Sequence, residues 1–176
     1  TSGHRFMAPD PFKVKGFDDY CAKLNNGFVI LNPAERKRKI AKQLSKLARK
    51  VSLHVKEDNE LLLEVAGLVE WPVPLIGHID TAFMSLPPEV LTTAIRTHLK
   101  YFLFETSSGD LAPYFATVAN IMTKDQGLGI IKGNERVLRA RLSDACFFWD
   151  KDRETTLASR IPALSEITFH DKLGSL

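Results

Sequence analysis

Basic residues are unevenly distributed along this chain, and a dense row of them could bind phosphate groups. Residues 1–56 contain thirteen Lys and Arg against four Asp and Glu, a net charge of +9, whereas residues 57–176 contain eleven against seventeen, a net charge of −6. The whole chain therefore carries only +3. Clustered cations bind nucleic acids because each phosphate that they neutralise releases counterions. A nucleic-acid surface is therefore expected in the first third of the chain.

Most of these cations lie in residues 34–51, which we predict to form one helix. Its apolar residues recur on one face, which must be buried: Ile40, Leu44, Leu47 and Val51. Basic residues cover the other faces: Arg36, Lys37, Arg38, Lys39, Lys42, Lys46, Arg49 and Lys50. Four of them form the predicted nucleic-acid-binding site: Lys42, Lys46, Arg49 and Lys50. A solvated helix face explains the same pattern, since charge runs usually are one. Both interpretations stay open.

Other motifs that resemble chemical sites lack essential parts. The glycine-rich stretch at residues 127–133 precedes a predicted helix but has no Gly-Lys-Ser/Thr ending of a phosphate-binding loop. His170 and Asp171 have no further histidine nearby in the sequence, whereas a metal site needs three or four ligands. Cys21 and Cys146 show no ligand spacing, so we expect two free, buried thiols. We predict no catalytic residue, no metal site and no cofactor bound by this chain.

The clearest apolar periodicity lies in residues 133–150. Gly133 and Asn134 are suited to the turn and N-cap of a helix. Arg141 and Asp144 are three residues apart beside the apolar stripe, so we predict an ion pair between them. The stripe recurs at helical spacing: Leu138, Leu142, Ala145 and Trp149. This helix must therefore cover a core.

The other elements alternate short strands with helices. Helices are expected at residues 17–24, 58–69 and 87–98. Strands are expected at residues 4–7, 28–31, 101–106, 114–121 and 129–132, with a hairpin turn at 107–110. Residues 71–77 are extended, and their prolines exclude a regular central strand at the beginning of this segment. Because the pattern does not repeat as strand–helix–strand, we predict one α+β domain, residues 1–176, with a mixed or antiparallel sheet packed against helices.

Tyr101 has two possible roles beside His98 and Lys100. The two basic residues suit the negative end of the preceding helix dipole, and a tyrosine at the start of a strand needs no ligand. Stacking of Tyr101 on an unpaired base is the functional alternative, because exposed aromatic rings beside cations suit single-stranded RNA.

Segments spread along the whole chain resemble one protein family, the beta subunit of the bacterial two-subunit glycyl-tRNA synthetase. They comprise residues 3–9 (GHRFMAP), 68–73 (LVEWPV), 86–91 (LPPEVL), 98–102 (HLKYF), 113–120 (PYFATVAN), 133–150 and 169–176 (FHDKLGSL). The chain departs from the family pattern at Leu99, which weakens any polar role there, and at His78 and Ile79. The family's beta subunit is several times longer, so the resemblance implies an internal piece from its N-terminal half.

The resemblance also implies function and partners. The family joins glycine to tRNA(Gly) with ATP and magnesium, and its alpha subunit holds the adenylate-forming site, so this piece is expected to be inactive alone. The implied partners are the alpha subunit, tRNA(Gly) and other beta-subunit domains. Neither DNA nor a membrane is an expected partner, and the expected location is the cytoplasm. The implied fold resembles the sheet-and-helix domain of the phenylalanyl-tRNA synthetase beta chain. A scaffold that docks the alpha subunit without RNA contact is the alternative. A third interpretation, an editing hydrolase, lacks a nucleophile and base.

Overall fold

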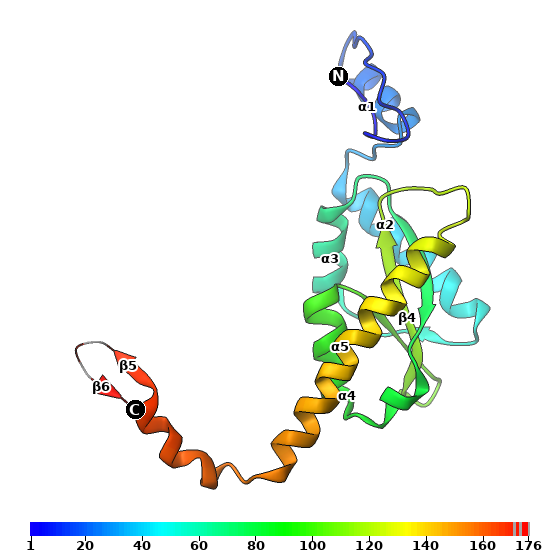
Figure 1. Cartoon of the computed structure of the whole chain (residues 1–176). Helices are drawn as coiled ribbons and strands as arrows, with labels where there is room; N and C mark the ends of the chain where they lie inside the picture. The colour runs from blue at the N-terminus through cyan, green and yellow to red at the C-terminus, as the bar shows by residue number, and fades with distance from the viewer. Residues whose placement is uncertain (171, 173, 176) are drawn as a thin grey trace.

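A four-stranded antiparallel sheet forms the centre of the molecule (Figure 1). The computed structural model describes the backbone of residues 1–170, 172, 174 and 175, and the side chains of residues 1–168, 170 and 172. In spatial order the strands are β1 (His54–Val55), β3 (Phe102–Glu105), β4 (Leu111–Ala119) and β2 (Val73–His78). Strand β2, which contains Pro74, lies at an edge, where the missing proline amide is tolerated. The predicted α+β fold is confirmed.

Helices cover both faces of this sheet. The α-helices are α1 (Phe17–Asn26), α2 (Pro33–Lys50), α3 (Asn59–Leu68), α4 (Pro88–Thr92) and α5 (Leu128–Glu154). The shorter helical segments are η1 (Thr81–Ser85), η2 (Thr93–Thr97) and η3 (Ala158–Glu166), and β5 (Thr168–His170) and β6 (Gly174–Ser175) form a small second sheet. Helices α2 and α3 pack on one face, whereas α4, η2 and the first part of α5 pack on the other. In Figure 1 the end of α5 and the following segment extend away from the sheet.

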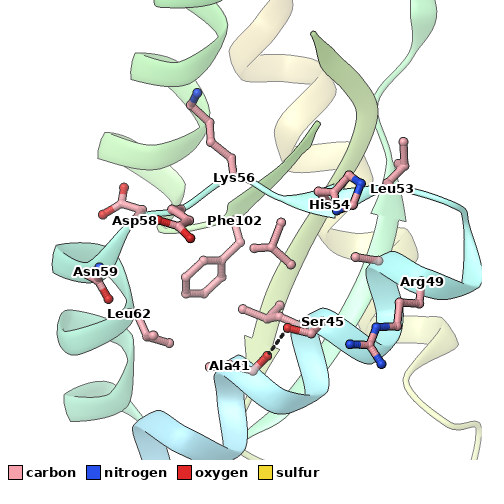
Figure 2. Close-up of a pocket in the computed structure, with 14 residues that line it drawn as sticks. Ala41, Ser45, Arg49, Leu53, His54, Lys56, Asp58, Asn59, Leu62 and Phe102 are labelled. Carbon is pink, nitrogen blue, oxygen red and sulfur yellow. Dashed lines mark hydrogen bonds between the residues drawn. The ribbon is translucent and has the colours of Figure 1, made fainter. Parts of the chain in front are cut away.

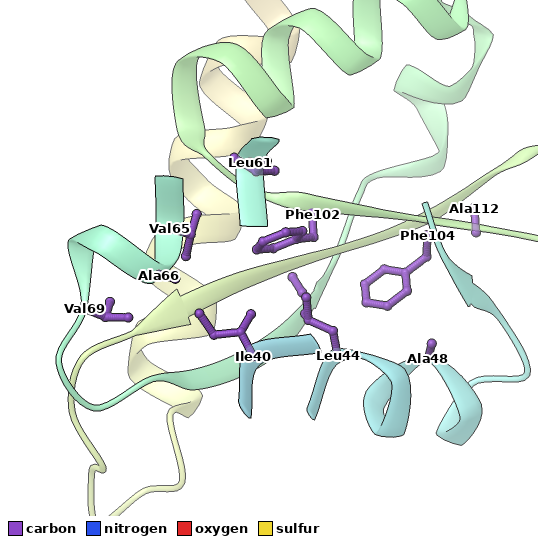
Figure 3. Close-up of a cluster of buried hydrophobic side chains, with 11 residues drawn as sticks. Ile40, Leu44, Ala48, Leu61, Val65, Ala66, Val69, Phe102, Phe104 and Ala112 are labelled. Carbon is purple, nitrogen blue, oxygen red and sulfur yellow. The ribbon is translucent and has the colours of Figure 1, made fainter. Parts of the chain in front are cut away.

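Strand β3 shows why both faces need helices. Phe102 and Phe104 point to the side of α2 and α3, whereas Tyr101 and Leu103 belong to the core under α5. Successive side chains of a strand point to opposite faces. All four are buried, because helices cover both faces of the sheet. Figure 3 shows the first core, in which the two phenylalanine rings lie against Ile40 and Leu44 of α2 and near α3.

The N-terminal segment contains no regular strand at either predicted place. His4 is buried, donates from Nε2 to the carbonyl oxygen of Asn120 at 2.6 Å, and accepts from the amides of Phe6 and Met7 at Nδ1. These bonds fold residues 4–7 into a turn. The predicted strand at residues 28–31 is also wrong: Phe28 has a φ of 60° after α1.

Helix α5 begins earlier than predicted because a side chain caps it. The carboxylate of Asp125 accepts hydrogen bonds from the amides of Gly127 and Gly129 at 3.1 and 2.8 Å. The Thr123 hydroxyl and these amides lower the pKa of Asp125. Gly127 has a φ of 88°, and a Cβ there would lie 2.7 Å from Leu75, so only glycine fits this turn.

Several predictions for this region are consequently wrong. Residues 129–132 form the first turn of α5 and not a strand, and Gly133 and Asn134 lie inside the helix. Arg141 and Asp144 are both exposed, and among the described residues they form no ion pair with each other. Two exposed charges gain little from pairing, since water solvates them well.

Two burial predictions also change. The apolar spacing in residues 58–69 predicts that Leu68 faces inward, but Leu68 is 65% exposed, because α3 packs through Leu61, Val65 and Ala66 and then ends. Cys21 and Cys146 are free thiols, but both are partly exposed and not buried.

Candidate nucleic-acid interface

The ends of helix α2 are stabilised by its own sequence. The Asn32 carboxamide oxygen accepts a hydrogen bond from the Ala34 amide at 2.9 Å, and Pro33 occupies the first helical position. Arg49 and Lys50 lie in the last turn, where cations favour the negative end of the helix dipole. The buried face is formed by Ile40, Leu44 and Ala48. Leu47 and Val51, expected on that face, are only partly buried at its edge.

Two cations of α2 hold the fold together. The Arg36 guanidinium donates to the carbonyl oxygens of Ala66, Ile30 and Leu31 at 2.8, 2.7 and 3.0 Å. The Lys39 ammonium lies 3.4 Å from the centre of the Trp71 ring, and burial lowers the pKa of Lys39. These two side chains therefore tie α2 to the segment that precedes it, to α3 and to the segment after α3. Sequence reasoning missed this role, because backbone carbonyls from distant segments leave no signal near a lysine or arginine.

The four predicted contact residues form a different group, which we name the α2 cation row: Lys42, Lys46, Arg49 and Lys50. All four are exposed. Within the residues whose side chains are described, none of them forms an ion pair or a side-chain hydrogen bond. Accessible cations without a carboxylate partner meet the electrostatic requirement for phosphate contact. The arrangement can therefore bind a polyanion by charge.

A cavity of about 480 Å³ lies beside the row, between α2, β1 and the start of α3; we name it the α2–α3 cavity (Figure 2). Its floor is buried and apolar: Leu44, Ala48 and Phe102. Its walls are half-buried: Ala41, Leu53, Val55 and Leu62. Figure 2 shows the Phe102 ring and the Leu62 side chain pointing into this space. Arg49 lines the cavity and also belongs to the α2 cation row.

Ion pairs fix two residues that line the cavity. Asp58 accepts from the Leu61 amide as the N-cap of α3 and pairs with Arg96, whose guanidinium lowers the pKa of that carboxyl. Lys56 pairs with Glu105 at 2.5 Å. These charges are already satisfied, so their contribution is to hold β1 and α3 in position.

Tyr101 lies inside the core and not on the surface. It is 6% exposed, its ring stacks on Phe115 with centroids 4.8 Å apart, and its hydroxyl donates to Asn134. Burial raises the pKa of this hydroxyl. The alternative in which Tyr101 stacks on a base is therefore wrong. Lys100 pairs with Glu64 at 2.9 Å, while His98 is exposed.

Metal sites and membrane-spanning helices are the other features considered for the described residues. Among the described residues no three His, Cys, Asp or Glu side chains come together as metal ligands, and Asp171 of the His170-Asp171 pair lies outside the described residues. Within the same part of the chain, no helix combines the length and apolar character needed to cross a membrane.

Several proteins of similar sequence are named "Glycine--tRNA ligase beta subunit", so the class of protein is that of tRNA ligase subunits. The relative from Rhodospirillum centenum is 54% identical over 176 residues, covering 100% of this chain and 25% of its own length. The relatives from Phenylobacterium zucineum and Paracoccus denitrificans are each 50% identical over 178 residues, covering 27% and 26% of their lengths.

The family described as "Glycyl-tRNA synthetase beta subunit" matches residues 1–176. The chain therefore belongs to the glycyl-tRNA synthetase beta subunit family. It spans about a quarter of the length of the relatives that it matches. The predicted family is confirmed.

Proposed function

We propose that this chain is one domain of a beta subunit that works with an alpha subunit to attach glycine to tRNA(Gly) in the cytoplasm. ATP and magnesium are used by the assembled ligase at the alpha subunit, and this domain supplies no catalytic group. Its contribution is to bind the tRNA backbone through the α2 cation row. The observation that carries this role is the exposure of four cations on one helix, without carboxylate partners among the described side chains, in a chain whose family acts on tRNA.

Replacing Lys46 and Arg49 by Gln in the complete ligase is expected to raise the apparent KM for tRNA severalfold. Two phosphate contacts are lost, so the slope of log affinity against log salt concentration becomes shallower by about two. Activation of glycine, measured by pyrophosphate exchange without tRNA, stays unchanged, because the proposed adenylate site lies on another subunit.

The matched control removes two exposed cations from the opposite face of the sheet. Lys132 and Arg136 lie on α5, are exposed and form no ion pair among the described side chains. The Lys132→Gln and Arg136→Gln pair is expected to leave the KM for tRNA near the wild-type value. An equal rise for both pairs would mean that net charge alone, and not the position of α2, determines tRNA affinity.

A scaffold role is the second candidate, and the far end of α5 favours it. Phe147 and Phe148 are 57% and 61% exposed, although phenylalanine is usually buried. Further exposed apolar residues follow: Leu157, Ile161, Leu164 and Ile167. Exposed apolar surface of this kind is typical of protein interfaces. We propose that it contacts the alpha subunit.

Replacing Phe147 and Phe148 by Ser is expected to weaken association of the two subunits at least tenfold. Apolar anchors of this size each contribute a large share of an interface. Sedimentation at several protein concentrations measures this, with Phe17→Ser as a control, since Phe17 is 72% exposed but lies on α1. Unchanged association of the double variant would reject the scaffold role for this surface.

A further inference from the structure

The α2–α3 cavity has the layered lining of a binding site. Its apolar floor, which includes the Phe102 ring, is buried, its walls are half-buried, and its rim is polar and exposed. The volume of about 480 Å³ falls in the range of about 300–1,000 Å³ that is usual for small-molecule sites. The apolar side chains that a ligand can contact are the half-buried walls Leu53, Val55 and Leu62, whereas the floor below them is almost fully covered.

Three polar side chains on the rim are unused by the fold. Arg49, His54 and Asn59 line the cavity and are exposed. Among the described side chains none of the three takes part in a hydrogen bond or ion pair, whereas Ser45 on the same rim donates its hydroxyl proton to the Ala41 carbonyl oxygen at 3.0 Å. A guanidinium, an imidazole and a carboxamide together offer several donors and acceptors.

We propose that the α2–α3 cavity holds the base of one unpaired nucleotide of the bound tRNA. A base has a flat apolar face that can pack on the half-buried walls Leu53, Val55 and Leu62, and a polar edge that suits the rim. Arg49 links the two sites, since it lines the cavity and continues the α2 cation row that is proposed to contact phosphates. This inference rests on the proposed RNA contact of α2 and adds the part of the RNA that is recognised.

The charges around the rim fix the orientation of the nucleotide. Glu57 and Asp58 lie on the side of α3, and Arg49 lies on the side of α2. The phosphate therefore lies near Arg49, and the amino group of a base can donate to the exposed Glu57 carboxylate. A base within a duplex cannot enter a cavity closed at its floor, so the nucleotide comes from a single-stranded part of the tRNA.

Filling the cavity tests the proposal in the complete ligase with a tRNA(Gly) transcript as the probe. Ala41→Phe places a ring into the wall, and Ala34→Phe is its matched control, because Ala34 is an exposed residue of the same helix outside the cavity. The Kd of the transcript is expected to rise roughly tenfold for Ala41→Phe, which corresponds to about 1.4 kcal/mol of lost apolar contact. The salt slope stays unchanged, because no cation is removed.

Chemical probing of the ribose 2′-hydroxyls gives a direct readout. One unpaired nucleotide, protected by the wild-type ligase, is expected to become reactive with Ala41→Phe. Asn59→Ala removes a rim carboxamide without adding bulk, and it is expected to raise the Kd severalfold. This variant decides the test if Ala41→Phe fails to fold.

Two results would overturn the cavity proposal alone. One is a Kd for Ala41→Phe and Asn59→Ala equal to that of Ala34→Phe while tRNA binding keeps its salt dependence. The other is weaker subunit association with unchanged tRNA affinity, which would identify a protein side chain as the occupant. Failure of the proposed function looks different: the Lys46→Gln and Arg49→Gln pair would then leave the Kd and the salt slope of tRNA binding unchanged.

Discussion

Replacing Phe104 by Ala is expected to lower the free energy of unfolding of residues 1–176 by about 3–5 kcal/mol. Phe104 is 0% exposed and lies in the core between the sheet and helices α2 and α3. Its removal loses apolar contacts and leaves a cavity that the surrounding side chains fill only in part. Urea unfolding followed by circular dichroism measures the change.

Phe148→Ala is the matched control. The same atoms are removed from a side chain that is mostly exposed at the end of α5, so the expected change is within about 0.5 kcal/mol. Equal losses at the two positions would contradict the position of the core on the α2 side of the sheet.

Replacing Arg36 by Ala is expected to lower the free energy of unfolding by about 2–4 kcal/mol. Its guanidinium satisfies the carbonyl oxygens of Ile30, Leu31 and Ala66, which lose their charged donor together. Arg38→Ala is the control, because Arg38 is an exposed arginine two residues further along the same helix. It is expected to change stability by less than about 0.5 kcal/mol. A similar loss from Arg38→Ala would show that general charge on α2, and not these bonds, stabilises the fold.

Elements with strong local signals could be predicted from the sequence. The Asn32 cap with Pro33 and the hairpin of β3 and β4 depend on residues close together in the chain. The start of α5 is set by the Asp125 carboxylate, which accepts from amides only two and four residues later, a local signal that the sequence interpretation overlooked. The burial of His4, in contrast, could not be predicted, because it depends on Asn120, more than a hundred residues away.

In the candidate site, too, some features could be predicted from the sequence and others depend on the fold. Exposure of Lys42, Lys46, Arg49 and Lys50 follows from the apolar stripe of one helix. Eight cations of α2 look alike in the sequence, however, and only the fold shows that Arg36 and Lys39 are occupied by carbonyl oxygens and an aromatic ring. The α2–α3 cavity left no sequence signal, since α2, β1, α3 and β3 each contribute part of its lining.

The central proposal is that the α2 cation row binds the tRNA backbone, and the salt dependence of binding tests it most directly. Affinity of the complete ligase for tRNA(Gly) is measured over a range of salt concentrations, with all four residues of the row unchanged or replaced by Gln. Each phosphate contact contributes about 0.7–0.9 to the slope of log affinity against log salt, so the variant is expected to lose about three to four units. An identical slope for the two proteins would contradict the proposal.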